Sequence, residues 1–373
     1  MSLRLFMVAG ETSGDRLGGD MLQELKKLGS EISAEGIGGA KMIAAGLTSL
    51  FPIDQFQVMG FTQIISALPR LWRHGQTLKK RILETNPDAV ILIDYPGFNL
   101  RLAQALRRSG YRGKIIQYGC PTFWAWGKKR QQILIDNYDL LLTLFPFEAE
   151  LFANTSLKAI FVGHPLLKAV NAYRQDKNWQ EKLDAGKQVI ALFPGSRHWE
   201  IEYNLPLQLA AAKALQHQFP ETVIAASMIY PEMLPEGVIP VDPSRNYDLM
   251  NIAHVAFAKS GTITLELALH QVPTVVTYVS SHINRWIAGY LLRIRLPFYC
   301  MTNILTGTKT FPEFIEKTPT ANQLKGALAE LFKEGKAREQ CLEECRHLRI
   351  KMENQQGSNS AAQAIKELLC GTK

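Results

Sequence analysis

Short apolar runs alternate with helix-patterned stretches along most of the chain, and this alternation constrains the fold more than any other feature. In the first half the runs occupy residues 3–8, 89–93, 114–118 and 140–144, with helical spacing at 14–28 and 100–108. Strands that are apolar on both faces lie in parallel sheets covered by helices on both sides. The pattern therefore predicts an α/β fold with doubly wound, Rossmann-like sheets.

The alternation stops once, between residues 163 and 187, where glycine, proline and polar residues are frequent. It resumes with apolar runs at 188–193, 222–227, 255–258 and 274–278. A chain of 373 residues is too long for one ordinary core, so we predict two domains, 1–165 and 166–345, facing a cleft. Residues 346–373 are expected to form a C-terminal helical tail, for which packing against the first domain is one option.

The composition limits the classes of protein to which the chain can belong. Apolar residues make up 46% of the chain, which excludes wholesale disorder. The formal net charge of +8 is spread out, which favours an anionic small substrate or an anionic membrane surface over nucleic acid. No apolar run approaches the ~18 residues of a membrane span, and the N-terminus lacks signal-peptide features. We therefore expect a cytoplasmic protein that touches membranes only from the side.

The five cysteines are scattered and odd in number, which argues against a disulfide framework. Cys341, Cys345 and His347 provide three ligands, whereas structural zinc requires four. We interpret them as one helix face with a nearby histidine and expect no metal.

Ligands bind beyond the carboxyl ends of the strands in such sheets, so the loops that follow the strands are the candidate sites. The first loop, 9–15, carries Gly10, Ser13, Gly14 and Asp15. Its glycines allow a ligand to approach the backbone, but it matches neither the GxGxxG fingerprint nor a P-loop. A tight turn capped by Ser13 or Asp15 explains the same residues equally well.

Asp94 directly follows the apolar run 89–93, and Asn99 lies a few residues further on. A carboxylate at this edge of a sheet is partly desolvated and suits a general base that takes the proton of a hydroxyl nucleophile. The alternative is an aspartate that caps the next helix. Trp126, in the loop that follows the run 114–118, suits either a wall for acyl chains or a sugar, or a hydrophobic plug.

The segment 193–200 has the composition of an anion site, because it contains Gly195, Ser196 and Arg197 after an apolar run. Backbone donors at a helix start and a guanidinium suit a diphosphate. The alternative is a surface ion pair between Arg197 and Glu200 or Glu202, worth ~0–1 kcal/mol.

The segment 259–266 resembles it, with Ser260, Gly261 and Thr262 placed to hold phosphate and Glu266 to accept ribose hydroxyls. A capping Ser260 and an exposed glutamate are the alternative. The presence of both segments in one half strengthens the anion-site interpretation.

An apolar stripe with flanking cations lies in the first half and contains Ile64, Ile65, Leu68, Leu71 and Trp72. This pattern is typical of a helix that lies in a membrane interface. An ordinary amphipathic helix with a solvated basic face is the alternative.

Taken in order, the loops resemble those of lipid-A-disaccharide synthase, a glycosyltransferase family of the GT-B fold. The matching stretches are AGETSGD, GIGGAKM, SLFP, VMGF, IDYPGFN, PTFWAW, LFPFE, VGHP, PGSRHWE, SGTITLE, TNILTG and PE, which run to about residue 315. Each piece alone is a weak signal, whereas the ordered set is specific.

The resemblance implies a metal-independent, inverting transferase that needs no cofactor. UDP-2,3-diacylglucosamine would be the donor, 2,3-diacylglucosamine 1-phosphate (lipid X) the acceptor, and the β-1′,6-linked disaccharide and UDP the products. It makes Asp94 the base and places Arg197 on the UDP diphosphate, with Asn303 and Glu313 near the donor. It also implies peripheral attachment to the cytoplasmic face of the inner membrane. The oligomeric state stays open, a homodimer being one option.

The chain departs from the family pattern at Lys259, where we expect a small residue, and at Thr302, where we expect proline. Neither should carry the reaction, although local donor contacts would differ. The rival interpretations are another GT-B transferase, such as the N-acetylglucosamine transferase of peptidoglycan synthesis, a UDP-sugar 2-epimerase, and a non-catalytic nucleotide-sugar binder.

Overall fold

The computed structural model describes residues 2–29, 31–56, 61–121, 129–184, 186–279, 297–315, 319–354 and 361–371. The chain divides into two compact units. The first comprises Met1–Pro165 and Asn354–Lys373, and the second Leu166–Glu353.

The first unit contains a seven-stranded sheet in the order β3-β2-β1-β4-β5-β6-β7, and every pair of neighbours is parallel. The strands are β1 (Ser2–Ala9), β2 (Glu31–Ile37), β3 (Leu47–Phe51), β4 (Ala89–Ile93), β5 (Lys114–Tyr118), β6 (Leu140–Thr143) and β7 (Lys158–Phe161). The helices are α1 (Thr12–Lys27), α2 (Ala40–Ala44), α3 (Phe61–Thr85), α4 (Pro96–Arg108), α5 (Lys129–Asn137), α6 (Pro146–Glu150) and α16 (Ala361–Cys370). β4 is fully buried, as its uninterrupted apolar sequence predicts.

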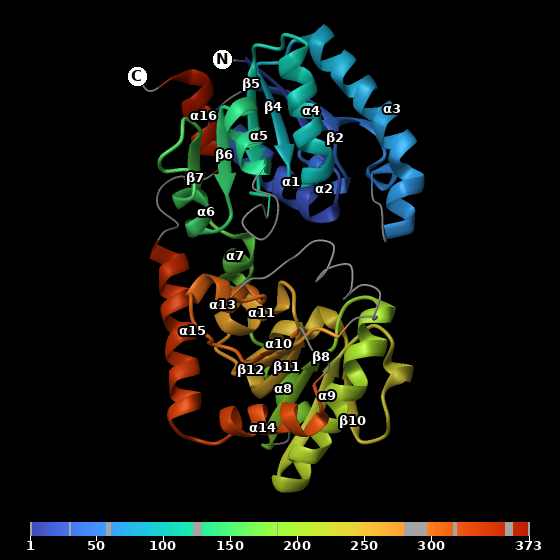
Figure 1. Cartoon of the computed structure of the whole chain (residues 1–373), viewed down its shortest axis with the longest axis vertical. Helices are drawn as coiled ribbons and strands as arrows, with labels where there is room; N and C mark the ends of the chain where they lie inside the picture. Colours follow the sequence, from blue (N-terminus) through green and yellow to red (C-terminus); the bar gives the residue numbers. More distant parts are fainter. Residues whose placement is uncertain are drawn as a thin grey trace. The chain divides into compact units, whose positions relative to one another are not determined.

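Helices cover both faces of this sheet (Figure 1), and each face has its own apolar core. On one face α1 and α16 pack on the strands, and on the other α3, α4 and α5 do so. The chain winds outward from β1 to β3 and then returns to β4 beside β1. Ala9 is in register with Ile93, so these two neighbouring strands end together and their following loops emerge side by side at a topological switch point.

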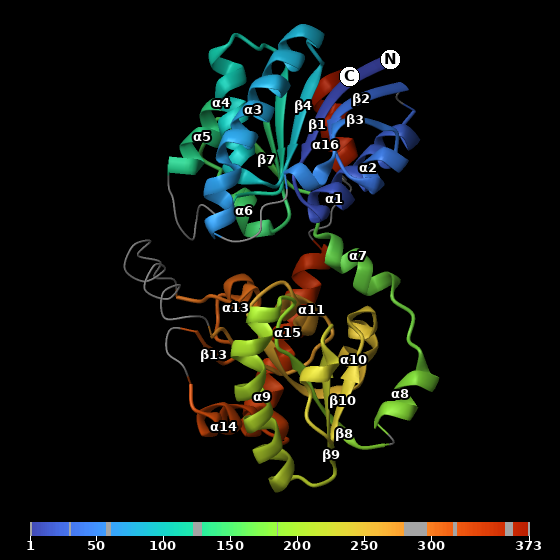
Figure 2. The ribbon, with the colours of Figure 1, turned by 90° about the vertical axis from the view of Figure 1, so that its right-hand side faces the viewer.

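The last helix, α16, belongs to the first unit. Figure 2 shows it in red among the blue segments, and Lys366 Nζ donates to the main-chain oxygen of Leu28 at 2.8 Å. The preceding helix α15 (Lys336–Asn354) lies in the second unit instead, where Arg349 bonds to the oxygens of Leu269 and Asn171. The returning tail therefore begins at 354 rather than at the predicted residue 346, because α15 is one uninterrupted helix.

The second unit contains a six-stranded parallel sheet in the order β10-β9-β8-β11-β12-β13. The strands are β8 (Gln188–Phe193), β9 (Thr222–Ser227), β10 (Val238–Val241), β11 (Ala253–Lys259), β12 (Thr274–Thr277) and β13 (Glu313–Phe314). The other helices are α7 (Pro165–Ala172), α8 (Lys177–Asp184), α9 (His198–Gln218), α10 (Asn246–Ile252), α11 (Ile263–Leu269), α13 (Met301–Thr306) and α14 (Ala321–Phe332). β8 and β11 form the second switch point, with Phe193 in register with Ala258.

Two doubly wound parallel sheets, with helices at the C-terminal end, confirm the predicted fold class. Within the described ranges, no helix is long and apolar enough to cross a membrane.

Candidate functional site

Asp94 and Tyr95 form a left-handed turn between β4 and α4. Their φ angles are 48° and 50°, a backbone region that residues other than glycine rarely adopt. Strained residues of this kind persist where the surroundings hold them, and they concentrate at functional sites. The N-cap of α4 is Tyr95, so Asp94 does not occupy the capping position that the sequence offered as an alternative.

Buried amide groups hold this turn in place. Asn99 Nδ2 donates to the main-chain oxygens of Asp94 at 2.7 Å and of Ile93 at 3.2 Å. Gln117 Nε2 donates to the oxygen of Gly119 at 3.0 Å and more weakly to that of Asp94 at 3.4 Å. Asn99 and Gln117 are both completely buried. Asn99 therefore stabilises the backbone of the loop in which we predicted a site. Gln117 stabilises the same turn, and the sequence did not point to it.

The loop after β1 lies directly against this turn. The Tyr95 hydroxyl donates to the Phe56 oxygen at 2.8 Å, which fixes the ring. A Cβ atom on Gly10 would lie 2.6 Å from that ring, so only glycine fits there. Gly14 is also buried, and its Cβ would lie 3.3 Å from that of Ala9. The structure thus brings Gly10 together with the Asp94 turn, as the switch point predicts.

Asp15 is engaged elsewhere in the first unit. Its Oδ1 accepts from the backbone N–H groups of Gly39 at 2.8 Å and Met42 at 3.0 Å, and its Oδ2 from that of Lys41 at 3.0 Å. It therefore fixes the start of α2. Ser13, in the first turn of α1, is exposed.

The environment of Asp94 strengthens its carboxylate as a base. Burial raises the pKa of Asp94, and a hydrogen bond from the backbone of Tyr95 opposes this shift only in part. A half-buried carboxylate with a raised pKa holds a proton more readily than an exposed one, which is the property required of a general base.

The second unit contains a pocket of about 290 Å³ at the carboxyl ends of β8, β9 and β11. It is lined by Phe193, Gly195, Ser196, Glu200, Ser227, Ile229, Pro243, Asn246, Lys259, Gly261, Thr262 and Ile263. The two predicted anion-binding segments therefore meet in one pocket, with Ser260 between two lining residues.

Glu200 organises the start of α9. Its Oε2 accepts from the backbone N–H groups of Ser196 at 3.0 Å and Arg197 at 3.3 Å. We expected these donors to be open for a phosphate, but the chain's own carboxylate occupies them. A glutamate three residues into a helix is the capping-box signal from which this could have been predicted.

Two cations meet the other oxygen of Glu200. Lys259 Nζ lies 2.9 Å and Arg197 Nη1 3.5 Å from Oε1. The predicted Arg197–Glu200 pair is therefore present, although its carboxylate is buried. Burial acts to raise the pKa of Glu200, but the hydrogen bonds from Lys259 and Ser196 and the nearby positive charges outweigh it and lower the pKa.

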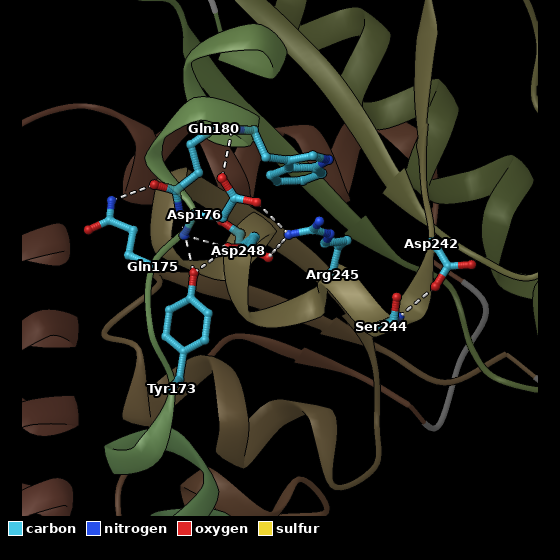
Figure 3. A network of polar contacts seen from close by, with 9 residues as sticks. Tyr173, Gln175, Asp176, Gln180, Asp242, Ser244, Arg245 and Asp248 are labelled. Carbon is cyan, nitrogen blue, oxygen red and sulfur yellow. Dashed lines mark hydrogen bonds and ion pairs between the residues drawn. The ribbon is translucent and has the colours of Figure 1, made fainter.

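A network of polar contacts in the second unit centres on Asp248 and Arg245 (Figure 3). Asp248 accepts from the Tyr173 hydroxyl and from Arg245 Nη1, and Arg245 also pairs with Asp176 at 2.9 Å. These contacts tie the connection between α7 and α8 to the start of α10. Asn246, which lines the pocket, follows Arg245 and accepts a hydrogen bond from Ser227.

Five residues that we predicted to contact the donor are not among the described residues that line this pocket, namely Arg197, Ser260, Glu266, Asn303 and Glu313. Glu266 Oε1 accepts from the Tyr247 hydroxyl at 3.0 Å, and burial raises its pKa, opposed by that bond. Asn303 donates to Glu313, whose other oxygen accepts from the backbone of Tyr299 at 2.9 Å. This pair stabilises the segment from 299 to 314, and its proximity to the donor stays a prediction.

The predicted membrane stripe lies on α3. Trp72 is 66% exposed and Leu68 44%, whereas Leu71 packs against the core. The side chains of Ile64 and Ile65 lie outside the described residues, and so does Trp126. Leu68 and Trp72 are thus apolar surface in contact with water, whereas Leu71 is partly buried.

A profile of the family described as lipid-A-disaccharide synthetase matches residues 5–368. The chain is 39% identical over 360 residues to the lipid-A-disaccharide synthase of Chlamydia pneumoniae, covering 92% of this chain and 59% of that one. It is 33% identical over 376 residues to the enzyme of that name from Coxiella burnetii, covering 98% of both. The chain spans about three fifths of the length of the chlamydial relatives it matches.

Solved structures share the fold at low sequence identity. A putative UDP-N-acetylglucosamine 2-epimerase from Listeria monocytogenes has a TM-score of 0.62 at 10% identity and covers 100% of this chain and 98% of that one. The calicheamicin glycosyltransferase CalG4 has a TM-score of 0.61 at 13% identity and covers 99% of both. At such identities the likeness establishes the fold alone, which is that of GT-B proteins.

Proposed function

Because this chain belongs to the lipid-A-disaccharide synthetase family, we propose that it is a glycosyltransferase of lipid A biosynthesis. It transfers the sugar of UDP-2,3-diacylglucosamine to 2,3-diacylglucosamine 1-phosphate and releases UDP. The relatives' names support this assignment, and the GT-B fold is compatible with it.

One observation carries the chemical part of the proposal, namely the half-buried carboxylate of Asp94 on a strained turn at a switch point. A sugar hydroxyl is a weak nucleophile, so it needs a base within reach as it attacks. In the proposed step the acceptor oxygen forms a bond to the anomeric carbon while the bond to the UDP oxygen breaks. The hydroxyl proton passes to Asp94, and a single displacement inverts the anomeric centre.

Negative charge develops on UDP as it leaves, and in this proposal the chain's own cations stabilise that charge. Arg197 and the pocket lined by Ser196, Gly261 and Thr262 are the groups assigned to the diphosphate. Electrostatic stabilisation of developing charge is usually the largest single catalytic contribution. The proposed reaction therefore uses neither a metal nor a cofactor.

We assign the nucleobase of the UDP-sugar donor to the same pocket. Phe193, Ile229 and Pro243 offer apolar surface for a nucleobase, and Asn246 offers polar atoms. Pockets for small molecules combine apolar walls with a few polar groups in this way.

An assay of the purified protein with UDP-2,3-diacylglucosamine and lipid X tests the proposal. The expected products are UDP and the β-1′,6-linked disaccharide. Plain UDP-N-acetylglucosamine serves as a control, since its epimerisation would identify a 2-epimerase instead. Binding of UDP without turnover of the acylated substrates would indicate a non-catalytic binder and refute the proposal.

A further inference from the structure

Lys259 is a partly buried cation in the wall of the pocket. It ends β11, and its side chain is 18% exposed, against 61% for Arg197. Its ammonium lies 5.1 Å from the centre of the Tyr278 ring, a cation–π distance that orients the side chain. Solvent screens a charge in this position less than it screens Arg197, so its field within the pocket is the stronger.

The charges around Glu200 do not cancel. Lys259 and Arg197 both approach Oε1, so two positive charges face one carboxylate. The other oxygen of Glu200 receives backbone N–H groups. The local surplus of positive charge favours an anion in the pocket.

Lys259 also has hydrogen-bonding capacity beyond its ion pair. An ammonium group has three N–H donors, and the contact with Glu200 uses one of them. Glu200 fixes the position of the ammonium, and within the described part of the chain no other hydrogen-bond acceptor contacts it, so the remaining donors can face a ligand in the pocket that Lys259 lines.

We propose that the Lys259 ammonium contacts the donor's diphosphate directly, as a second cation beside Arg197, and gives the pocket its preference for a nucleoside diphosphate over a nucleoside. This inference rests on the proposed function of the pocket as the UDP-sugar site.

The test compares UDP with uridine on the full chain. Lys259→Met keeps the length and apolar stem of the side chain and removes the charge. UDP affinity, measured by calorimetry, should fall about 10- to 100-fold, the loss expected for a charged hydrogen bond, while uridine affinity, measured by ligand-detected NMR, should change less than about twofold. Lys259→Arg should recover most of the UDP affinity. Lys213→Met, on the exposed side of α9, is the matched control and should change neither affinity.

The outcomes separate the alternatives. Equal losses for UDP and uridine would mean that Lys259 only shapes the pocket, and unchanged UDP affinity would mean that it makes no phosphate contact; either result overturns the inference. If the wild-type chain did not bind UDP at all, the proposed function itself would be refuted. That result would be known before any variant is made, so it is distinct from a failure of the inference about Lys259.

Discussion

Asn99 holds Asp94 by its backbone: the buried side-chain amide donates to the main-chain oxygen of Asp94 at 2.7 Å. This hydrogen bond does not involve the carboxylate of Asp94. Asn99 is therefore a positioning residue, because it keeps a left-handed turn in place without touching the proposed reacting atoms.

Asn99→Ala should lower the free energy of unfolding by about 1–3 kcal/mol, because it leaves buried main-chain oxygens without a strong partner. The turnover number should fall about 10- to 100-fold, since a carboxylate displaced by about 1 Å loses much of its effect. UDP affinity should stay unchanged. Asn137→Ala is the matched control, as its amide donates to the Ile133 oxygen within α5. An equal loss of turnover in both variants would argue against a positioning role.

Asp94→Asn should abolish transfer while UDP binding is kept. The substitution preserves the shape of the side chain and its ability to accept from the Tyr95 backbone, but it removes the basicity. We expect a rate loss of at least about 100-fold, measured with both acylated substrates at saturating concentration. Turnover close to wild type would exclude Asp94 as the base.

The raised pKa of Asp94 fixes the sign of two pH effects. Because the base must be ionised, kcat/KM should decline on acidification at a pH above the ordinary aspartate pKa of about 3.9.

Burial disfavours the ionised form of Asp94 in the folded chain. The contribution of Asp94 to stability is therefore full below its pKa in the unfolded chain, and it is lost as the pH rises through its pKa in the folded chain. Asp94→Asn should therefore unfold at a higher temperature than wild type at neutral pH, with the difference vanishing near pH 3. A lower melting temperature at neutral pH would contradict this.

Arg197→Ala should weaken UDP binding about tenfold or more and reduce the rate, because it removes a charged donor from the proposed diphosphate site. Arg346→Ala, another exposed arginine of the second unit that pairs with a glutamate, is the control. Calorimetric titration with UDP distinguishes them, and equal affinities in the two variants would show that the diphosphate role is wrongly assigned.

The central strands of both sheets could be predicted, because an uninterrupted apolar run leaves few alternatives to a buried strand. The runs 89–93 and 188–193 coincide with β4 and β8. β2 and β3 were missed, since the half-exposed sequences EISAEGI and LTSLF lack such a run. The positive φ angles of Asp94 and Tyr95 have no local signature, because neither is glycine. The Lys259–Glu200 pair joins positions 59 residues apart, a contact that only the sheet order creates.

The exposed side chains of Leu68 and Trp72 should bind the protein to anionic membranes, with Arg70 and Arg73 beside them on α3. An apolar surface flanked by cations gains both hydrophobic and electrostatic attraction at a lipid interface. Replacing both residues by serine should lower the partition constant onto phosphatidylglycerol vesicles, measured by sedimentation, by at least about tenfold, because even half of the about 1.5–3 kcal/mol for each fully transferred apolar side chain amounts to at least about 1.5 kcal/mol for the two. Leu83→Ser, an exposed leucine near the other end of the same helix, should leave sedimentation unchanged. The stripe would be an ordinary solvated helix face if the double variant sedimented like wild type. Turnover of a water-soluble, short-chain donor and acceptor should be the same in all three proteins, since these residues lie on a helix rather than in the loops that carry Asp94 or the pocket.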